Sequence, residues 1–383
     1  MQTAHAYPDL PLPQGVRERW VHNHNGCRMH VLEAGYETAG RPCVVLLHGF
    51  PELAFSWRHQ LPVLADAGFH VIAPDQRGYG RSDGTDVRFE DDLRPFSSFN
   101  RVADTLGLVR AMGHELVTAV VGHDYGAHVA GWCALMRPDV FRSVVFMSAT
   151  FGGAPALPLG SQAVDSAAVS RVLADLGRLP HPRKHYWAYF ASAEANEEMW
   201  HCPQGMHAFL RAYFHMKSGD WRDNHPFPLA EWSAAELAKL PRYYVMDADR
   251  NMAQTVAPEL PIAASGCAWL SDEDLRVYAE EFTRTGFQGG LQLYRVLLDA
   301  GMTGETKALA GRTVDVPSIY ISGERDWGNH QVPGGLRRLQ QQICTRMQPP
   351  QFIPRAGHWV QQEAAEEVNR RLLSFLSGLS PSN

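Results

Sequence analysis

The chain is predicted to be an α/β protein with a mostly parallel central sheet, helices on both faces of the sheet and one helical insertion. Short apolar runs rich in β-branched residues alternate with helical patterns over the first 150 residues. Alternation of this kind favours a parallel sheet with right-handed crossovers. The alternation stops after residue 150 and resumes near residue 309. We therefore expect a core formed by residues 1–150 and 309–383, and a helical cap formed by residues 151–308.

The individual elements follow from the spacing of apolar residues. Runs that are apolar on both faces indicate strands buried within a parallel sheet, and they occupy residues 43–47, 70–73, 117–121 and 144–147. Residues 316–321 and 351–353 continue this pattern after the insertion. Helical spacing predicts helices at residues 99–112, 127–136, 272–283, 291–298 and 363–376.

Composition restricts the class of protein. The formal net charge of −6 over 383 residues gives no general attraction to nucleic acid or to an anionic membrane. Six widely spaced cysteines without a C-x-x-C pair are typical of reduced, mostly buried thiols. We see neither a secretory signal nor an apolar run of about 18 residues that could cross a membrane. We therefore expect a soluble cytoplasmic protein.

Residues 122–126, with the sequence G-H-D-Y-G, follow a predicted buried strand and open a predicted helix. This spacing is the G-x-nucleophile-x-G pattern of a tight strand-to-helix turn that lifts one side chain above a sheet. Glycines suit such a turn because it leaves no room for a Cβ atom. Asp124 is therefore a candidate nucleophile; the alternative is an aspartate that only caps a helix N-terminus.

An aspartate at this position carries chemical information. A serine that attacked an alkyl electrophile would become an ether, and general base catalysis cannot hydrolyse an ether. A carboxylate becomes an ester, which water can cleave at the carbonyl. Asp124 thus favours substitution at an sp³ carbon, for which epoxides and alkyl halides are the natural substrates.

Partners for this nucleophile follow in the chain order acid, then histidine, which is typical of the α/β-hydrolase fold. Asp326 comes just after a predicted strand, and His358 lies in a loop after the last predicted strand. His358 is expected to activate water, with Asp326 holding its tautomer and stabilising its cation. Glu324 is the rival for the acid, and His358 is one of 18 histidines.

The run H-G-F-P-E at residues 48–52 directly follows the first predicted buried strand. In this fold that loop and the residue after the nucleophile each supply a backbone N–H to an oxyanion hole. The expected donors are Phe50 and Tyr125, and Phe50–Pro51 is a candidate cis peptide. Glu52 either positions water near His123 or His358 or acts as a structural salt-bridge partner. We count His48, Glu52 and His123 as supporting residues.

Taken together, these motifs resemble the epoxide hydrolases of the α/β-hydrolase superfamily. The matching core motifs are H-G-F-P-E at 48–52, S-W-R at 56–58, D-Q-R-G-Y-G at 75–80, G-H-D-Y-G-A at 122–127 and G-H-W at 357–359. Two further matches fall within the predicted cap, at residues 186–190 and 285–295. The resemblance implies the α/β-hydrolase fold with an inserted helical cap, hydrolysis of an epoxide to a vicinal diol, and no metal or organic cofactor.

The same resemblance points to two cap tyrosines, Tyr186 and Tyr294, as catalytic residues. Opening an epoxide expels an alkoxide, and phenols with a pKa near 10 stay protonated and able to hydrogen-bond the ring oxygen. Simple packing of the lid is the alternative explanation for these side chains. The rival tyrosines are Tyr189, Tyr243 and Tyr244.

Two departures from the family pattern leave alternatives open. Tyr125 stands where the family usually has tryptophan, and residues 233–269 match nothing in the pattern. That stretch could line the pocket, extend the lid or mediate a homodimer. The rival functions are a haloalkane dehalogenase that uses the same triad and a catalytically silent protein that binds a small apolar ligand. The expected partners are a small apolar epoxide and water, with no nucleic acid and no membrane.

Overall fold

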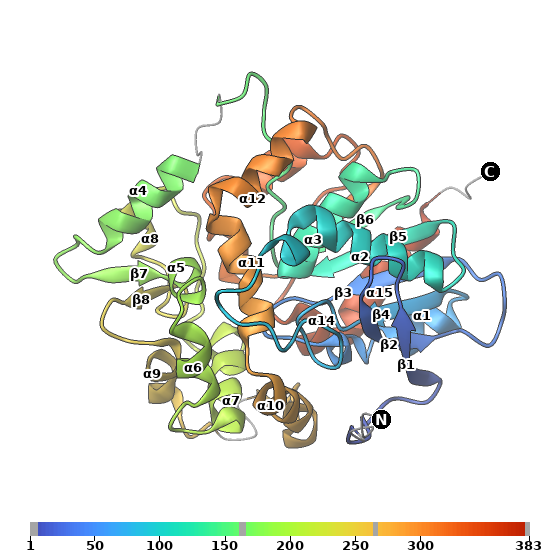
Figure 1. Ribbon diagram of the computed structural model, residues 1–383, viewed down its shortest axis with the longest axis horizontal. Helices are drawn as coiled ribbons and strands as arrows, with labels where there is room; N and C mark the ends of the chain where they lie inside the picture. The colour runs from blue at the N-terminus through green and yellow to red at the C-terminus, as the bar shows by residue number, and fades with distance from the viewer. Residues whose placement is uncertain (1–6, 161–165, 263–266, 380–383) are drawn as a thin grey trace.

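The fold is built on one large twisted sheet, seen in a computed structural model that describes residues 7–160, 166–262 and 267–379 (Figure 1). In this described part, eight strands are arranged in the order β1-β2-β4-β3-β5-β6-β9-β10. Their bounds are Val16–His22 (β1), Arg28–Ala34 (β2), Cys43–Leu47 (β3), His70–Pro74 (β4), Val117–His123 (β5), Val144–Met147 (β6), Ser318–Gly323 (β9) and Gln351–Ile353 (β10). β2 pairs antiparallel with β1 and β4, and the remaining pairs are parallel. The predicted mostly parallel sheet is therefore confirmed, whereas β1 and β2 were not predicted.

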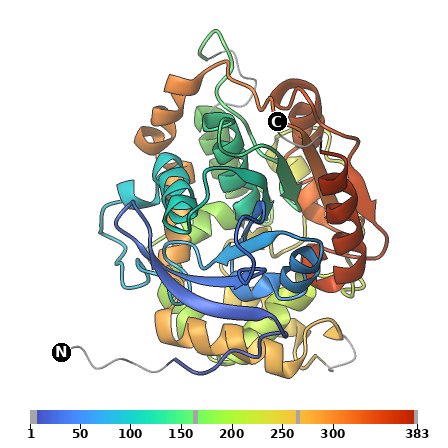
Figure 2. The ribbon, with the colours of Figure 1, turned by 90° about the vertical axis from the view of Figure 1, so that its right-hand side faces the viewer.

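Helices cover both faces of this sheet (Figure 2). Val45 and Leu47 of β3 pack in one hydrophobic cluster with α2 and α3. Val44 and Leu46, which point the other way, pack in a second cluster with α1 and α15. Alternate residues of one strand thus feed two separate cores, as expected for a strand covered on both sides. The bounds of the core helices are Leu61–Asp66 (α1), Ser98–Ala111 (α2), Tyr125–Met136 (α3), Gly335–Arg338 (α13), Val360–Glu363 (α14) and Ala365–Ser377 (α15). Short 3₁₀ helices occupy Ala54–Trp57 (η1), Arg94–Phe96 (η2) and Trp327–Asn329 (η6), and a π-helical turn occupies Leu339–Ile343 (η7).

The chain between β6 and β9, here called the insertion, lies beside the large sheet rather than within it (Figure 1). Its helices are Ser166–Leu176 (α4), Tyr186–Phe190 (α5), Ala195–Trp200 (α6), Met206–Lys217 (α7), Ala234–Leu237 (α8), Met252–Val256 (α9), Ala257–Glu259 (η3), Asp272–Thr285 (α10), Gln288–Leu298 (α11), Ala300–Gly304 (α12) and Glu305–Leu309 (η5). Two short strands, Arg183–His185 (β7) and Val245–Asp247 (β8), form a separate antiparallel pair. The unmatched stretch 233–269 therefore contributes β8 to this small sheet.

Ion pairs made by buried arginines tie α10 of the insertion to the sheet side of the molecule. Arg81 Nε lies 2.7 Å from Glu281 Oε1, and Arg58 Nη2 lies 3.2 Å from Asp274 Oδ2. Both arginine side chains are almost fully buried, so these pairs hold a fixed geometry better than exposed pairs would. The hydrophobic cluster that includes Leu46 continues through the insertion. The two parts thus pack as one body around a shared core.

All six cysteines are free and buried, as predicted. Within residues 7–160, 166–262 and 267–379, no helix combines the length and the apolar character needed to cross a bilayer.

Candidate active site

Asp124 occupies the sharp turn between β5 and α3. Its φ is 51° and its ψ is −120°, a backbone conformation that non-glycine residues rarely adopt and that stores strain at functional sites. A Cβ atom on Gly122 would lie 2.1 Å from the Gly126 carbonyl oxygen, and one on Gly126 would lie 2.1 Å from the Leu47 carbonyl oxygen. Both glycines are therefore required by close backbone packing, which explains the G-x-D-x-G spacing.

The structure brings the three predicted triad residues together. Asp124 Oδ2 lies 3.1 Å from His358 Nε2, and His358 Nδ1 lies 3.1 Å and 3.2 Å from the two carboxylate oxygens of Asp326. The side chains of His358 and Asp326 are each 1% exposed, whereas that of Asp124 is 13% exposed. Glu324, the rival acid, is exposed. The accessible carboxylate thus stands at the open end of a buried acid–imidazole pair.

The charges of the triad residues stabilise one another. Burial raises the pKa of Asp124, but the His358 hydrogen bond and the positive charge of Lys217 outweigh burial and hold the net pKa below its ordinary value. Burial and Lys217 lower the pKa of His358, yet the carboxylates of Asp326 and Asp124 reverse this and leave a net increase. In the free protein Asp124 is therefore ionised at neutral pH, and His358 holds its proton to a higher pH than an ordinary histidine does.

The predicted oxyanion loop lies against the nucleophile. The Phe50 N–H donates a hydrogen bond of 3.0 Å to Asp124 Oδ1, and the candidate Phe50–Pro51 peptide is cis. Tyr125 is the first residue of α3, where a backbone N–H has no acceptor within the helix. One expected donor thus already contacts the carboxylate, and the other is placed on the adjacent residue.

Glu52 and His123 form a buried hydrogen-bonded chain behind His358. Glu52 Oε2 lies 2.6 Å from His123 Nδ1, and His123 Nε2 lies 2.7 Å from the His358 carbonyl oxygen. Glu52 Oε1 accepts hydrogen bonds from the side-chain amides of Gln361 and Gln362. Both Glu52 oxygens are therefore occupied by protein groups, and the contacts favour the structural role over water positioning.

His48 lies behind the oxyanion loop rather than in front of it. Its Nε2 accepts a hydrogen bond of 3.1 Å from the Gln76 backbone N–H, and the Gln76 side-chain amide also donates a hydrogen bond to the His48 carbonyl oxygen. Its Nδ1 lies 2.9 Å from the Gly49 carbonyl oxygen. These bonds fix the path of the loop that carries the Phe50 N–H.

The two predicted tyrosines approach the nucleophile from the insertion. Tyr186 begins α5 and Tyr294 lies on α11, and their ring centroids are 5.8 Å apart in an edge-to-face arrangement. Burial raises the pKa of both phenols, so both stay protonated at neutral pH. The Tyr186 hydroxyl donates a hydrogen bond of 3.1 Å to Gln331 Oε1.

Asp124, Tyr186 and Tyr294 line the same cavity, which has a volume of about 330 Å³. Its apolar wall is formed by residues from both the sheet side and the insertion: Ala149, Phe151, Val169, Trp187, Trp232, Leu293, Leu297, Val332 and Pro333. The polar side chains around it include Tyr125, His128, Thr150, Gln331 and Arg338. An apolar cavity with a few convergent polar groups is typical of a small-molecule site.

The rival tyrosines do not line this cavity. The Tyr189 hydroxyl donates to Glu198, and the Tyr243 hydroxyl donates to Asn224. Tyr244 contributes through its backbone instead, because its carbonyl oxygen accepts the Tyr186 N–H at 2.8 Å. The unmatched stretch thus supports Tyr186 from behind.

Sequence reasoning missed two residues of the site, Gln331 and Lys217. Gln331 follows η6 and hydrogen-bonds Tyr186 from the side of the core, while Lys217 ends α7 and is 4% exposed. Neither belongs to a recognisable motif. A lysine near the end of an amphipathic helix ordinarily indicates a solvated face, so no local signal marks Lys217 as buried.

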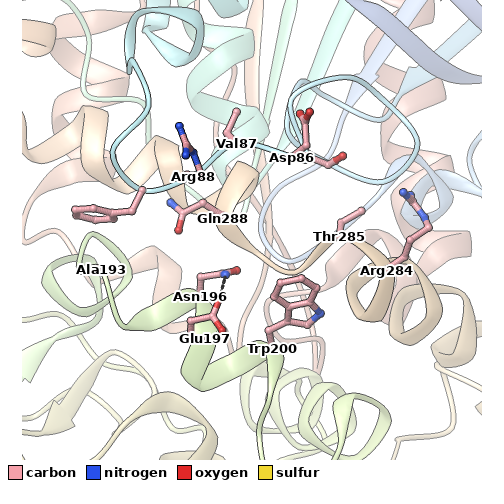
Figure 3. A pocket seen from close by; sticks show the side chains of 12 residues that line it. Asp86, Val87, Arg88, Ala193, Asn196, Glu197, Trp200, Arg284, Thr285 and Gln288 are labelled. Atoms are coloured by element: carbon pink, nitrogen blue, oxygen red, sulfur yellow. Dashed lines mark hydrogen bonds between the residues drawn. The ribbon is translucent and has the colours of Figure 1, made fainter.

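A second hollow, of about 500 Å³, lies between residues 85–89 and the helices α6, α10 and α11 (Figure 3). Asn196 donates a hydrogen bond to Glu197 at its edge. Charged side chains of both signs surround it, namely Asp86, Arg88, Glu197 and Arg284. None of the predicted site residues lines this hollow, whereas Asp124, Tyr125, Tyr186 and Tyr294 all line the apolar cavity.

Comparisons with known proteins agree with the fold. The family described as alpha/beta hydrolase fold matches residues 42–365. Epoxide hydrolase A of Mycobacterium tuberculosis (strain ATCC 25618 / H37Rv) is 37% identical over 372 residues, covering 93% of this chain and 96% of the relative. Epoxide hydrolase B of the same strain is 32% identical and covers 94% and 98%.

Solved structures give the same result. An epoxide hydrolase from an endophytic Streptomyces superimposes with a TM-score of 0.76 at 29% identity, covering 96% of each chain. Potato (Solanum tuberosum) epoxide hydrolase I gives a TM-score of 0.73 at 27% identity, covering 95% of this chain and all of the potato chain. This chain belongs to the α/β-hydrolase fold family and, within it, to the epoxide hydrolases.

Proposed function

We propose that the protein hydrolyses a small apolar epoxide to a vicinal diol through a covalent ester on Asp124. The observation that carries this proposal is that one apolar cavity is lined by the Asp124 carboxylate and by two protonated phenols, Tyr186 and Tyr294. Ring opening needs a nucleophile for the carbon and a proton donor for the oxygen. The cavity offers both, and its wall suits an apolar substrate.

In the first step, Asp124 Oδ2 attacks an epoxide carbon, and the bond from that carbon to the ring oxygen breaks. Oδ2 is the better candidate because Oδ1 accepts the Phe50 N–H and is thus suited to become the ester carbonyl oxygen in the oxyanion hole, whereas Oδ2 hydrogen-bonds the His358 imidazole. The ring oxygen takes a proton from Tyr186 or Tyr294, and the resulting phenolate regains a proton from solvent. The product of this step is a hydroxyalkyl ester.

In the second step, water attacks the ester carbonyl carbon while His358 Nε2 takes its proton. The N–H groups of Phe50 and Tyr125 hold the developing oxyanion. Collapse of this intermediate breaks the bond to the alkyl oxygen, which takes the proton back from His358. The diol leaves, and Asp124 remains as a carboxylic acid. Because its pKa is held below the ordinary value, it releases this proton to solvent, which offsets the proton taken up by the phenolate and restores the carboxylate.

The change of charge between the two steps prepares His358 to act as a base. In the free protein, Asp124 and Asp326 together raise the pKa of His358. Esterification removes the charge of Asp124, so the pKa of His358 falls at the stage where a neutral imidazole is needed. Asp326 remains to orient the ring and to stabilise the transient cation.

We further propose that residues 151–308 act as the cap over a core formed by residues 1–150 and 309–383. This division is supported by the origin of the catalytic groups: Asp124, Asp326 and His358 come from the sheet side, whereas both phenols come from the insertion. The active site would then form at the boundary between the two.

A single turnover in ¹⁸O-labelled water, with the enzyme in excess over a panel of epoxides, tests the ester. We expect an unlabelled diol and one ¹⁸O atom in the peptide that contains Asp124, both measured by mass spectrometry. Label in the diol of the first turnover would mean that water opens the ring directly. Haloalkanes run in parallel test the rival function, which predicts release of halide and alcohol.

Replacement of the cavity phenols should slow ring opening. We expect Tyr294→Phe and Tyr186→Phe each to reduce the rate of ester formation by about 10²-fold, and the double variant by up to about 10⁴-fold, because general acid catalysis contributes on that scale. Stopped-flow measurement of ester formation gives the rate. Tyr189→Phe is the matched control, since its hydroxyl contacts Glu198 outside the cavity. A double variant as fast as the control would remove both tyrosines from the mechanism.

A further inference from the structure

Lys217 is a buried lysine that motif reasoning left out of the site. Its side chain is 4% exposed at the end of α7, although lysine is almost never fully buried without a compensating partner. Its Nζ lies over three aromatic rings, 5.1 Å from the centroid of Trp359, 5.3 Å from that of Tyr244 and 5.6 Å from that of Tyr213. Within the described part of the chain, these ring faces rather than an ion pair hold the ammonium group.

Lys217 is also tied to the segment that carries His358, through its backbone and through the Trp359 ring. The His358 backbone N–H donates a hydrogen bond of 2.9 Å to the Lys217 carbonyl oxygen. Trp359, whose ring faces the ammonium group, directly follows His358, and the two rings lie 4.7 Å apart. The main chain and the side chain of Lys217 thus both contact the loop that carries His358.

The charge of Lys217 acts on every member of the triad. It lowers the pKa of Asp124, of Asp326 and of His358. Burial lowers the pKa of Lys217 itself, and the nearby carboxylates of Asp124 and Asp326 reduce that decrease without reversing it. Lys217 lowers the pKa of His358, whereas the carboxylates of Asp124 and Asp326 raise it.

The groups around His358 come from four places in the fold. Asp124 faces it from the turn after β5, and Asp326 from the turn after β9. The positive charge of Lys217, at the end of α7, acts on it as well. The His123 ring lies 5.1 Å away, with its Nδ1 paired to Glu52. Once Asp124 is an ester, burial and the positive charge of Lys217 still lower the pKa of the imidazole, and the negative charge of Asp326 opposes them.

We propose that Lys217 is a positioning residue for the second step, and that its buried positive charge keeps the imidazole of His358 neutral in the ester intermediate. A neutral imidazole can take the proton of the attacking water, whereas an imidazolium cannot. The inference rests on the proposed role of His358 as the base. It assigns Lys217 no contact with substrate.

The test compares Lys217→Met, which keeps length and apolar contacts, with Lys217→Arg, which keeps the charge. Each variant is mixed with excess epoxide, and the rates of ester formation and of ester hydrolysis are measured separately across pH by stopped flow and quenched-flow mass spectrometry. For Lys217→Met we expect the acid limb of hydrolysis to move to higher pH by about one unit, because a nearby charge shifts a pKa by at least that much. Lys217→Arg should retain most of the wild-type limb.

Several controls keep the outcome decisive. Lys239→Met removes a half-exposed lysine that pairs with Glu236 and should leave both steps unchanged. Lys217→Gln replaces Lys217→Met if the latter fails to fold, as judged by circular dichroism and thermal melting. An equal slowing of hydrolysis at all pH values, or an unmoved limb, would overturn the proposal. Failure of the wild-type protein to form an ester would instead refute the proposed function.

Discussion

Replacing Asp124 with alanine should reduce epoxide turnover by at least about 10⁴-fold, the scale seen when a nucleophile is removed from a catalytic triad. Without the carboxylate no ester can form. His358 cannot substitute for it, because in the proposed mechanism His358 activates water against an ester carbonyl that would no longer exist. The remaining cavity can still bind the epoxide and hydrogen-bond its oxygen, so a small residual rate is expected. Diol formation under saturating epoxide gives the value of kcat.

The Asp124 variant must be shown to be folded, since its position has an uncommon φ of 51°. Circular dichroism and thermal melting provide that check. Asp92→Ala, at an exposed carboxylate that pairs with Arg94, is the matched control and should behave as wild type. Turnover by Asp124→Ala above about 1% of the wild-type rate would mean that another group opens the ring, because such a loss is far smaller than that expected for a nucleophile.

Replacing His358 with glutamine should separate the two steps. We expect the ester to form at a rate within about tenfold of wild type but to persist, because general base catalysis of its hydrolysis is lost, and kcat to fall by about 10⁴-fold or more. Intact-protein mass spectrometry should then show one equivalent of adduct with the mass of the added epoxide. Epoxide consumption should stop near one equivalent per active site, and diol should appear only at the slow rate of ester hydrolysis.

Two results would contradict this scheme for His358. A variant that turns over normally would place the base elsewhere, with His123 the nearest imidazole at a ring distance of 5.1 Å. A variant that neither turns over nor forms an adduct would show that His358 is needed before the ester exists. His207→Gln, at a half-exposed histidine on α7, controls for loss of a histidine in general.

The sheet could be predicted where its strands are buried on both faces. All five residues of β3 and all four of β6 are buried, and apolar runs of this kind are distinctive. β1 escaped prediction because it is a half-exposed strand at the edge of the sheet, in which Arg17, Glu18 and Arg19 interrupt the apolar pattern. β7 and β8 have three residues each and show no periodicity at all.

The site could be predicted where its residues follow strands in recognisable turns. Asp124, Asp326 and His358 each come directly after a strand or in a loop beyond one, and the structure places their side chains in hydrogen-bonding contact. Lys217 and Gln331 could not be predicted in this way. Their positions depend on how the insertion packs against the C-terminal part of the chain, and no local pattern encodes that packing.

Backbone carbonyl groups at the end of α7 accept hydrogen bonds from His358 and from residues near it. Lys217 accepts the His358 N–H, Phe214 accepts the Trp359 indole N–H at 2.8 Å, and Gly219 accepts a hydrogen bond from Arg325 at 2.8 Å. Exchanging the insertion between relatives to alter substrate range would therefore also exchange the carbonyl groups that hold the loop of His358 in place. Chimaeras that keep residues 214–219 with their own C-terminal loop should retain the hydrolytic half of the reaction, whereas wholesale grafts should stall as esters.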